Sequence, residues 1–404
     1  MYDVIVIGAG ASGIISAIVS SSLGKKVLLL EKLPKIASKI KATGGGRCNL
    51  SNTLSRDDFM SKFGKNGRFM TSALEIFSKD DLIKFFKEIG LDTHCPDGFR
   101  IFPTSHSSQS VIDALANKMD KLNIEILCSS PVLDINISNI EKKEVFIQNS
   151  SFFCKNIIIA TGGLGYSTLG ASGDGYIWAK NSGHKITSTY PAMMPLHTKE
   201  RWVENCRADT IAKVEMYVDI KKYKKLKAVG DLIFTKCGIR GPVVLDFARE
   251  ITPLFDKYDE IPLKMNLIKR KNENDLIKLF KENPILSIKD CLSIILPMSL
   301  IEQLCLLCEV NSSLIFKKLE GNKKELLLKI LVQTPLTILG HDGFKMAMIT
   351  RGGISLKDIN PNTMQSKIVS GLYFCGEIID IDGPCGGYNL QWAFSSGYLA
   401  GNLK

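Results

Sequence analysis

The sequence predicts an α/β protein whose core is a parallel sheet, interrupted by a large insertion. Three observations predict this class: the chain opens with a strand, a glycine turn and a helix, a second strand follows that helix, and further buried strands occur near residues 156 and 371. Strands that alternate with helices pair in parallel. The early elements therefore indicate a Rossmann-type domain that is completed after the insertion.

The composition is that of an ordinary globular protein with more than one domain. The chain has 404 residues, 45% of them hydrophobic and 23% charged, which is more than one core usually organises. No apolar run is long enough for a membrane span, and the strand that begins at Tyr2 leaves no room for a signal peptide. Eleven scattered cysteines fit no disulfide framework. We expect a soluble, cytoplasmic protein, either a monomer or a homo-oligomer.

The first element of the predicted site is the turn that follows the strand over residues 2–7. Gly8 permits the tight turn, Gly10 lets a diphosphate approach the backbone, and Gly13 lets the helix pack closely on the strand. The N-terminus of the helix predicted over residues 14–24 then faces the negative charge.

A second strand, over residues 26–30, ends at Glu31. An acid at this distance from the glycine turn accepts hydrogen bonds from ribose hydroxyls and repels a 2′-phosphate. The turn is therefore expected to take FAD or NAD rather than NADP.

Two later strands, over residues 156–159 and 371–374, end in small-residue turns at Thr161-Gly162-Gly163 and Gly376-Glu377. Both turns resemble elements of flavoproteins with two dinucleotide folds, which favours FAD. In that class the acid after the glycine binds the ribityl or diphosphate part of FAD. Glu377 stands where aspartate is commoner, and Asp380 or Asp382 could share the role.

Two more glycine clusters extend the predicted site. Gly386 and Gly387 begin a helix expected to run to about residue 402, whose N–H groups would face the pyrimidine edge of a flavin; an ordinary glycine-started amphipathic helix is the alternative. The run Gly44–Gly46 lets the backbone approach a flat or phosphorylated ligand, while Arg47 and Asn49 offer donors to flavin carbonyls or phosphates.

On these residues the chain resembles the BaiN/RdsA-type, or YhiN-like, family of NAD(P)/FAD-dependent flavoproteins. The matching segments are distributed over the whole chain: Gly8 to Gly13, Thr43 to Asn49, Gly98 to Pro103, Thr161 to Gly163, Leu232 to Thr235, Gly238 to Pro242, and Gly376-Glu377 through Asn389. The resemblance implies an FAD domain built from both chain ends, with an insertion made of a β-rich substrate domain and a small helical domain.

We therefore expect an FAD-binding domain over 1–190 and 341–404, a β-rich, barrel-like substrate domain over 191–268 and 332–350, and a helical insertion over 269–331. The sequence pattern agrees with this division. Residues 212–220 and 225–235 read as strands, and Leu276, Ile277, Leu279 and Phe280 have helical spacing.

The predicted FAD contacts are the motif residues and their neighbours. They are Gly8, Gly10, Ala11, Ser12, Gly13, Glu31, Lys32, Thr43, Gly44, Gly45, Gly46, Arg47, Cys48, Asn49, Val132, Ala160, Thr161, Gly162, Gly376, Glu377, Asp380, Gly386, Gly387, Tyr388, Asn389 and Leu390. No second glycine motif stands in a strand–turn–helix unit, so NAD(P)H is expected to bind only transiently; electrons from the substrate itself are the alternative. The five histidines show no metal-ligand spacing, and we predict no metal.

Candidates for the proton donor are few. Cys48 and Cys385 lie in glycine-rich segments expected near the flavin, and a thiol can protonate a carbon after hydride delivery. For both residues the alternative is a small buried side chain without a catalytic role.

The resemblance implies three substrate classes: uridine in ribosomal RNA reduced to dihydrouridine, conjugated steroid or bile-acid enones, and small amines that are oxidised with peroxide formation. The net charge of +11 and the basic run Lys221, Lys222, Lys224, Lys225 and Lys227 favour RNA, because binding a polyanion releases its counterions. A solvated lysine-rich hairpin is the alternative interpretation of that run. A flavin-bound RNA-binding or assembly factor without turnover is the non-enzymatic alternative.

Overall fold

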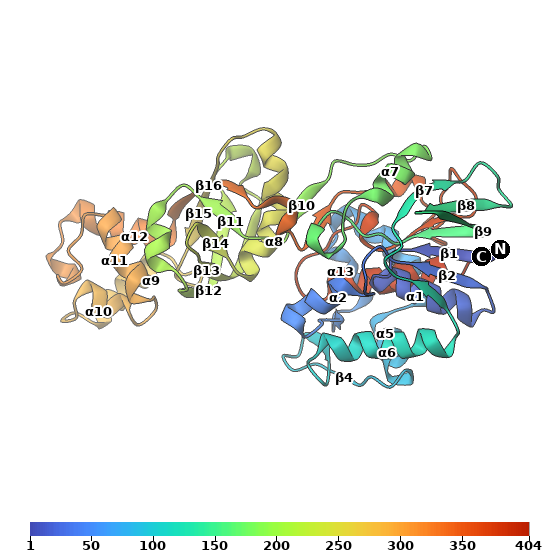
Figure 1. Cartoon of the computed structure of the whole chain (residues 1–404). Coiled ribbons are helices and arrows are strands. Elements are labelled where there is room, and N and C mark those ends of the chain that lie inside the picture. Colours follow the sequence, from blue (N-terminus) through green and yellow to red (C-terminus); the bar gives the residue numbers. More distant parts are fainter. Residues whose placement is uncertain (404) are drawn as a thin grey trace. The chain divides into compact units, whose positions relative to one another are not determined.

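The computed structural model describes residues 1–403 (Figure 1). They form two compact units, one made of residues 1–190 with the chain from Met348 onward and the other of Pro191–Ala347. The chain leaves the first unit through β10 (Tyr190–Ala192). The division of the insertion into separate β-rich and helical domains stays a prediction.

A seven-stranded sheet forms the centre of the first unit, in the order β6-β2-β1-β9-β8-β7, with β18 also paired to β9. Its strands are β1 (Tyr2–Ile7), β2 (Val27–Leu30), β6 (Glu125–Leu127), β7 (Val132–Asn136), β8 (Lys143–Ile147), β9 (Ser150–Ile159) and β18 (Leu372–Phe374). β1 pairs in parallel with β2 and β9, whereas β7 and β8 add an antiparallel edge.

The register brings the carboxyl ends of the central strands to one edge of the sheet. Ile7, the last residue of β1, pairs with Leu30 of β2 and with Ile159 of β9. Phe374 of β18 pairs with the same Ile159. The glycine turn, Glu31 and the turns after β9 and β18 therefore begin side by side, where open α/β sheets bind their ligands.

The first unit also contains helices. They are α1 (Ala11–Ser22), α2 (Ser38–Ala42), α3 (Arg56–Ser61), α4 (Thr71–Ile76), α5 (Lys79–Glu88), α6 (Ser108–Lys121), α7 (Asp174–Asn181) and α13 (Tyr388–Gly401). Short strands complete the unit: β3 (Ser51–Asn52), β4 (Thr93–His94), β5 (Arg100–Pro103) and β17 (Ile349–Arg351).

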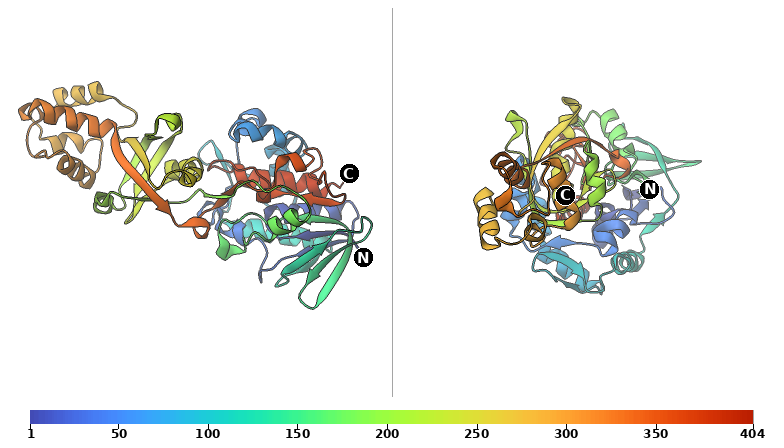
Figure 2. Two further views of the ribbon diagram at one scale, coloured as in Figure 1. Left: turned by 90° about the horizontal axis from the view of Figure 1, so that it is seen from above. Right: turned by 90° about the vertical axis from the view of Figure 1, so that its left-hand side faces the viewer.

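The two ends of the chain pack together through α1 and α13, which lie next to each other in Figures 1 and 2. Glycines on α13 make this approach possible. A Cβ on Gly397 would lie 2.3 Å from the carbonyl oxygen of Ser12, and one on Gly401 would lie 2.6 Å from that of Ser16. The C-terminal helix thus becomes a supporting element of the first glycine turn.

The second unit contains a closed antiparallel barrel, in the order β11-β14-β13-β12-β15-β16. Its strands are β11 (Leu196–Thr198), β12 (Thr210–Val218), β13 (Lys227–Phe234), β14 (Gly238–Arg240), β15 (Ile261–Asn266) and β16 (Thr334–His341), with α8 (Pro242–Ile251) packed on β13. Alternate residues of β12, namely Val214, Met216 and Val218, are buried, as the period of a strand requires.

Helices follow β15 in this unit: α9 (Glu273–Glu282), α10 (Ile288–Leu292), α11 (Met298–Leu307) and α12 (Gly321–Val332). Leu276 and Phe280 are buried, whereas the neighbouring Ile277 and Leu279 are partly buried. The helical spacing of these apolar residues is confirmed.

The structure confirms the predicted α/β class, with a Rossmann-type domain and an inserted β-barrel. None of the helices within residues 1–403 has the length and apolar character of a membrane span.

Candidate functional site

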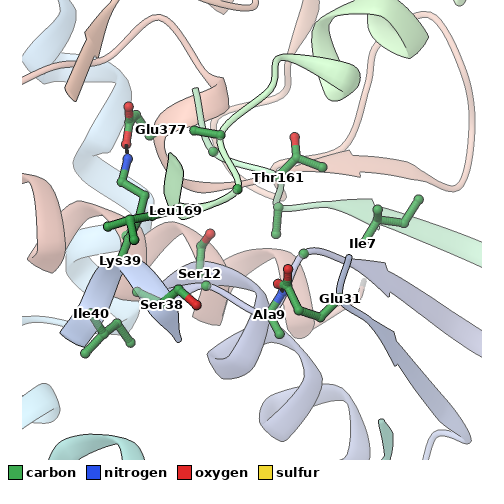
Figure 3. A pocket seen from close by; sticks show the side chains of 18 of the residues that line it. Ile7, Ala9, Ser12, Glu31, Ser38, Lys39, Ile40, Thr161, Leu169 and Glu377 are labelled. Carbon is green, nitrogen blue, oxygen red and sulfur yellow. Dashed lines mark hydrogen bonds and ion pairs between the residues drawn. The ribbon is translucent and has the colours of Figure 1, made fainter. Parts of the chain in front are cut away.

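The candidate site is a cleft at the carboxyl ends of β1, β2 and β9 (Figure 3). It encloses about 1300 Å³, a volume that includes open solvent at its mouth. Residues from the glycine turn, α2, the turn after β9, β17, the turn after β18 and α13 line it. The cleft is therefore bordered by segments from both ends of the chain.

The three glycines of the first turn have different surroundings. Gly8 has a φ of +103°, and a Cβ there would lie 2.6 Å from the carbonyl oxygen of Ala160. A Cβ on Gly13 would lie 1.9 Å from the carbonyl oxygen of Gly8. Gly10 lines the cleft, and apart from its chain neighbours no described heavy atom lies within 4 Å of its Cβ position. Gly8 and Gly13 therefore serve the fold, while Gly10 leaves space for a ligand.

The first turn of α1 is suited to bind an anion. Gly10 is its N-cap, so no side chain caps the helix, and residues 11–14 contain no acid. Ala11 and Ser12 line the cleft at this end. The N–H groups of a helix start carry partial positive charge and readily bind phosphate.

Glu31 is held in place at the end of β2. Its Oε2 accepts a hydrogen bond from the backbone N–H of Ala9 at 2.8 Å, and its Oε1 accepts one from Leu33 at 2.9 Å. Each carboxylate oxygen can accept further bonds. Glu31 therefore offers acceptors to ribose hydroxyls in a defined direction.

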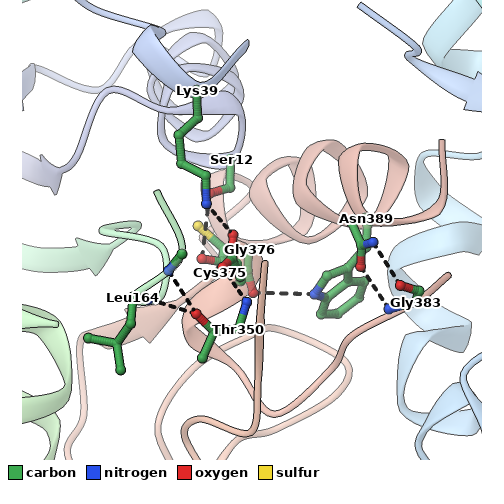
Figure 4. A network of polar contacts seen from close by, with 11 residues as sticks. Ser12, Lys39, Leu164, Thr350, Cys375, Gly376, Gly383 and Asn389 are labelled. Carbon is green, nitrogen blue, oxygen red and sulfur yellow. Dashed lines mark hydrogen bonds and ion pairs between the residues drawn. The ribbon is translucent and has the colours of Figure 1, made fainter. Parts of the chain in front are cut away.

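A polar network lies on the side of Ser12 that is opposite Glu31 (Figures 3 and 4). Glu377 Oε2 accepts a hydrogen bond from Lys39 Nζ at 2.7 Å, and Oε1 accepts one from the backbone N–H of Thr350 at 2.9 Å. The Thr350 hydroxyl in turn accepts hydrogen bonds from the N–H groups of Leu164 at 2.7 Å and Gly165 at 3.1 Å. Both oxygens of Glu377 are thus held by groups from distant segments.

Thr161 lines the cleft, but its Oγ1 is buried and has no hydrogen-bond partner within residues 1–403. A Cβ on Gly175 would lie 2.3 Å from this oxygen, so Oγ1 packs against α7. The uncapped start of α1 and the open space at Gly10 are therefore the features that fit a cofactor, and they suit the diphosphate of FAD.

The cleft brings together about half of the predicted contacts. Those that line it are Gly8, Gly10, Ala11, Ser12, Glu31, Lys32, Thr43, Val132, Ala160, Thr161, Gly162, Glu377, Asn389 and Leu390. The described residues of the prediction that do not line it are Gly13, Gly44, Gly45, Gly46, Arg47, Cys48, Asn49, Gly376, Asp380, Gly386, Gly387 and Tyr388. Their contacts with a cofactor stay predictions.

The second glycine run does not line the cleft, although the preceding Thr43 does. Gly44 and Gly45 are exposed and adopt positive φ angles of 58° and 65°. The Arg47 guanidinium is 5.5 Å from the ring centre of Phe102. In the amide orientation that satisfies its neighbours, Asn49 accepts a hydrogen bond from the Gly387 N–H at 2.9 Å. In this structure Asn49 therefore supports the start of α13.

Packing accounts for the glycine at the start of α13. A Cβ on Gly387 would lie 2.4 Å from the carbonyl oxygen of Ser51, and its φ is +82°. Tyr388 is buried, with its ring centre 5.0 Å from that of Phe59. The next two residues, Asn389 and Leu390, line the cleft. The first turn of the helix therefore reaches the cleft, while its glycine packs on β3.

The two candidate thiols differ in exposure. Cys48 is fully buried, and burial raises the pKa of its thiol to about 11. Cys385 is partly exposed. Neither is among the cleft residues within the described chain. Asp380 also lies outside this lining, and burial raises the pKa of its carboxyl above the ordinary value.

Sequence reasoning assigned no role to several cleft residues. They are Leu33, Ser38, Lys39, Ile40, Ser130, Leu169, Gly170, Ala171, Asp174, Trp178, Met348, Ile349, Thr350, Ile381 and Ala393. Most stand one to several residues beyond a motif, and their residue types carry no ligand signal of their own. Lys39 and Asp174 are charged residues near glycine-rich segments, and their charge was the signal that could have singled them out.

Comparisons with known proteins agree with this geometry. The chain matches the HI0933-like protein Rossmann domain over residues 2–403. A 3-dehydro-bile acid delta(4,6)-reductase of Clostridium scindens is 30% identical, over 98% of this chain and 97% of its own length. A ribosomal RNA dihydrouridine synthase of Haemophilus influenzae is 31% identical, over 98% of this chain and 96% of its own.

The fold also occurs in a solved structure, a 3-ketosteroid-delta4-(5alpha)-dehydrogenase of Rhodococcus jostii RHA1. The TM-score is 0.52 and the identity 14%, over 99% of this chain and 96% of that chain. At this identity the likeness concerns the fold alone. The family resemblance predicted from the motifs is confirmed, and the chain belongs to the HI0933-like Rossmann-domain family, a family of FAD-dependent oxidoreductases.

Proposed function

We propose that this protein is an NAD(P)H-driven reductase of a C=C bond, with uridine in ribosomal RNA as its substrate. FAD would occupy the cleft, with its adenosine ribose at Glu31, its diphosphate at the start of α1 and its flavin half toward Glu377. NAD(P)H would bind only transiently to deliver electrons. Such a role places the protein in the cytoplasm, together with the ribosomal RNA.

Bound FAD supplies the hydride transfer, and the protein supplies binding, orientation and a proton. Gly10 leaves room for the diphosphate, and the N–H groups of Ala11 and Ser12 counter its charge. Glu31 directs the ribose through its two acceptor oxygens. The residues of this chain thus hold an extended cofactor across the edge of the sheet.

The observation that carries the RNA proposal is the basic run between β12 and β13. Lys221, Lys222, Lys224 and Lys225 are exposed, and none has an ion-pair partner in the described part of the chain. By contrast, Lys227 pairs with Glu215 at 3.4 Å. Lysines without acidic partners are available to neutralise phosphates.

The salt dependence of RNA binding tests this assignment. The four unpaired lysines are replaced by glutamine, and affinity for a ribosomal RNA fragment is measured over a range of salt concentrations. Each lost phosphate contact reduces the slope of log K against log salt by about 0.7–0.9, so the loss of all four would reduce the variant slope by about 3–4. The change Lys227→Gln is the control, because this lysine already has an acidic partner. Equal slopes for wild type and the fourfold variant would remove the support for RNA.

Loss of the gene tests the reaction itself. Dihydrouridine in ribosomal RNA should disappear in the deletion strain and return when the wild-type gene is restored. An unchanged dihydrouridine content would exclude uridine as the substrate.

A second candidate is the reduction of a conjugated enone on a steroid or bile acid. The relative from Clostridium scindens, whose name gives a bile-acid substrate, supports it. Anaerobic titration with NADH or NADPH, followed at the flavin absorbance, separates the candidates when RNA or enone is then added. Reoxidation by the enone alone would favour the second candidate.

A further inference from the structure

The cleft contains more acidic than basic side chains. Its lining includes the acids Glu31, Asp174, Glu377 and Asp382, but the only lining cations among the described residues are Lys32 and Lys39. Lys32 pairs with Asp174 at 3.1 Å, and Lys39 pairs with Glu377 at 2.7 Å. A site for a cofactor with two phosphate charges depends strongly on these two cations.

The Lys39–Glu377 pair lies away from the adenosine end of the cleft. Figure 3 shows Ser12, at the start of α1, between Glu31 on one side and the Lys39–Glu377 pair on the other. Glu31 marks the adenosine ribose and the start of α1 marks the diphosphate. The Lys39–Glu377 pair therefore faces the flavin half of the cofactor. This assignment of adenosine, diphosphate and flavin along the cleft rests on the proposed binding of FAD.

A second contact, independent of Lys39, holds Glu377 at the cleft. Its Oε1 accepts a hydrogen bond from the backbone N–H of Thr350, and only 20% of its side chain is exposed. The Lys39 side chain is 27% exposed, so water screens the pair only in part. Without Lys39, a half-buried negative charge would remain next to the flavin.

We propose that Lys39 is a positioning residue that neutralises Glu377 and thereby sets both the affinity for FAD and the reduction potential of the bound flavin. An uncompensated carboxylate repels the phosphates of the cofactor. It also opposes the added electrons, because an anionic reduced ring next to it is destabilised.

Four variants test this: Lys39→Met, Lys39→Arg, Glu377→Gln and the double variant Lys39→Met with Glu377→Gln. Apoprotein is titrated with FAD, and the midpoint potential of the loaded protein is measured with redox dyes. Lys39→Met should raise Kd by about tenfold or more and make the potential more negative. Lys39→Arg should stay close to wild type. The double variant should recover most of the potential, because the uncompensated charge is gone.

Lys41→Met is the matched control, since Lys41 is an exposed lysine on the same short helix that does not line the cleft. The thermal transition of each apoprotein shows whether a variant still folds, and the Glu377→Gln series gives the charge effect independently of Lys39. Unchanged affinity and potential in Lys39→Met, or equal effects in the single and double variants, would overturn the inference. Wild-type protein that fails to bind FAD would instead refute the proposed function.

Discussion

The carbonyl oxygen of Gly8 lies 1.9 Å from the position that a Cβ on Gly13 would occupy. Both groups belong to the main chain, so no flexible side chain can move aside to make room for a Cβ on Gly13. A shift of the turn or of α1 would disturb β1. The same turn leaves open space at Gly10. One motif therefore combines a packing requirement with a ligand-binding requirement, and the two can be separated by substitution.

Gly13→Ala should destabilise the protein even without cofactor. Forcing a methyl group into a closely packed position typically costs about 1–3 kcal/mol, and contact with rigid backbone places this change at the upper end. Urea unfolding of the apoprotein measures it. A free energy of unfolding equal to that of wild type would show that the turn and the helix adapt.

Gly10→Ala should have the opposite pattern. The φ of Gly10 is −84°, which alanine adopts, and no described atom lies near the added methyl group. We expect the stability of the apoprotein to be retained and Kd for FAD to rise by about tenfold or more, because the methyl group occupies space next to the diphosphate. Calorimetric titration provides Kd, and an unchanged value would mean that the diphosphate binds elsewhere.

Glu31→Gln should weaken FAD binding while the turn keeps its shape. The remaining amide oxygen can replace one of the two acceptors that now hold Ala9 and Leu33. Loss of the charged acceptor should raise Kd by about tenfold. Glu88→Gln, at an exposed position on α5, is the control. If both variants bind FAD equally well, Glu31 does not contact the ribose.

The two candidate thiols should behave differently. Cys48 is fully buried with a thiol pKa of about 11, so it stays protonated at neutral pH and should not respond to thiol reagents in the folded protein. Cys48→Ala should leave the rate of flavin reoxidation by substrate unchanged. Cys385→Ser should slow it by about a hundredfold if Cys385 is the general acid. Single-turnover stopped-flow absorbance measures both rates, and equal rates for all three proteins would end the role of either thiol.

His184 should make the first unit sensitive to acid. Its Nδ1 is 3.0 Å from the carbonyl oxygen of Ala179, and Nε2 is 2.7 Å from the Ser366 hydroxyl, which also accepts hydrogen bonds from Ile368 and Val369. Burial lowers the pKa of the imidazole below its ordinary value of 6.5. The neutral ring is therefore favoured in the folded state.

Because folding lowers the pKa of His184, its neutral imidazole stabilises the folded state above pH 6.5. This stabilisation is lost as the pH falls through the pKa of His184 in the folded protein. Between pH 7 and pH 5 the wild type should lose up to about 1.4 kcal/mol per pH unit more than His184→Asn. Urea unfolding at several pH values gives the difference. Parallel pH profiles would show that His184 does not titrate on unfolding.

Much of the fold was predictable because the relevant signals are local. The apolar run over residues 2–7 forms β1 with those bounds, and the glycine turn leads into α1. The barrel hairpin has its basic turn between β12 and β13. The site was predictable only at the ends of strands. The register of β1, β2, β9 and β18 aligns these ends, and so brings Gly8, Glu31, Ala160 and Glu377 to the same edge of the sheet. The cleft residues on α2, α7 and β17 carry no comparable local signal.

The amino-acid sequence by itself determined where strands end, which glycines accept positive φ angles and which acid follows β2, because these properties depend on neighbouring residues. Only the tertiary structure decided which glycines face a ligand and which face backbone. It also decided that Lys39 pairs with Glu377, 338 positions away. The physical reason is that such contacts depend on how distant segments pack, and a side chain carries no information about its partner until the sheet and helices bring the two together.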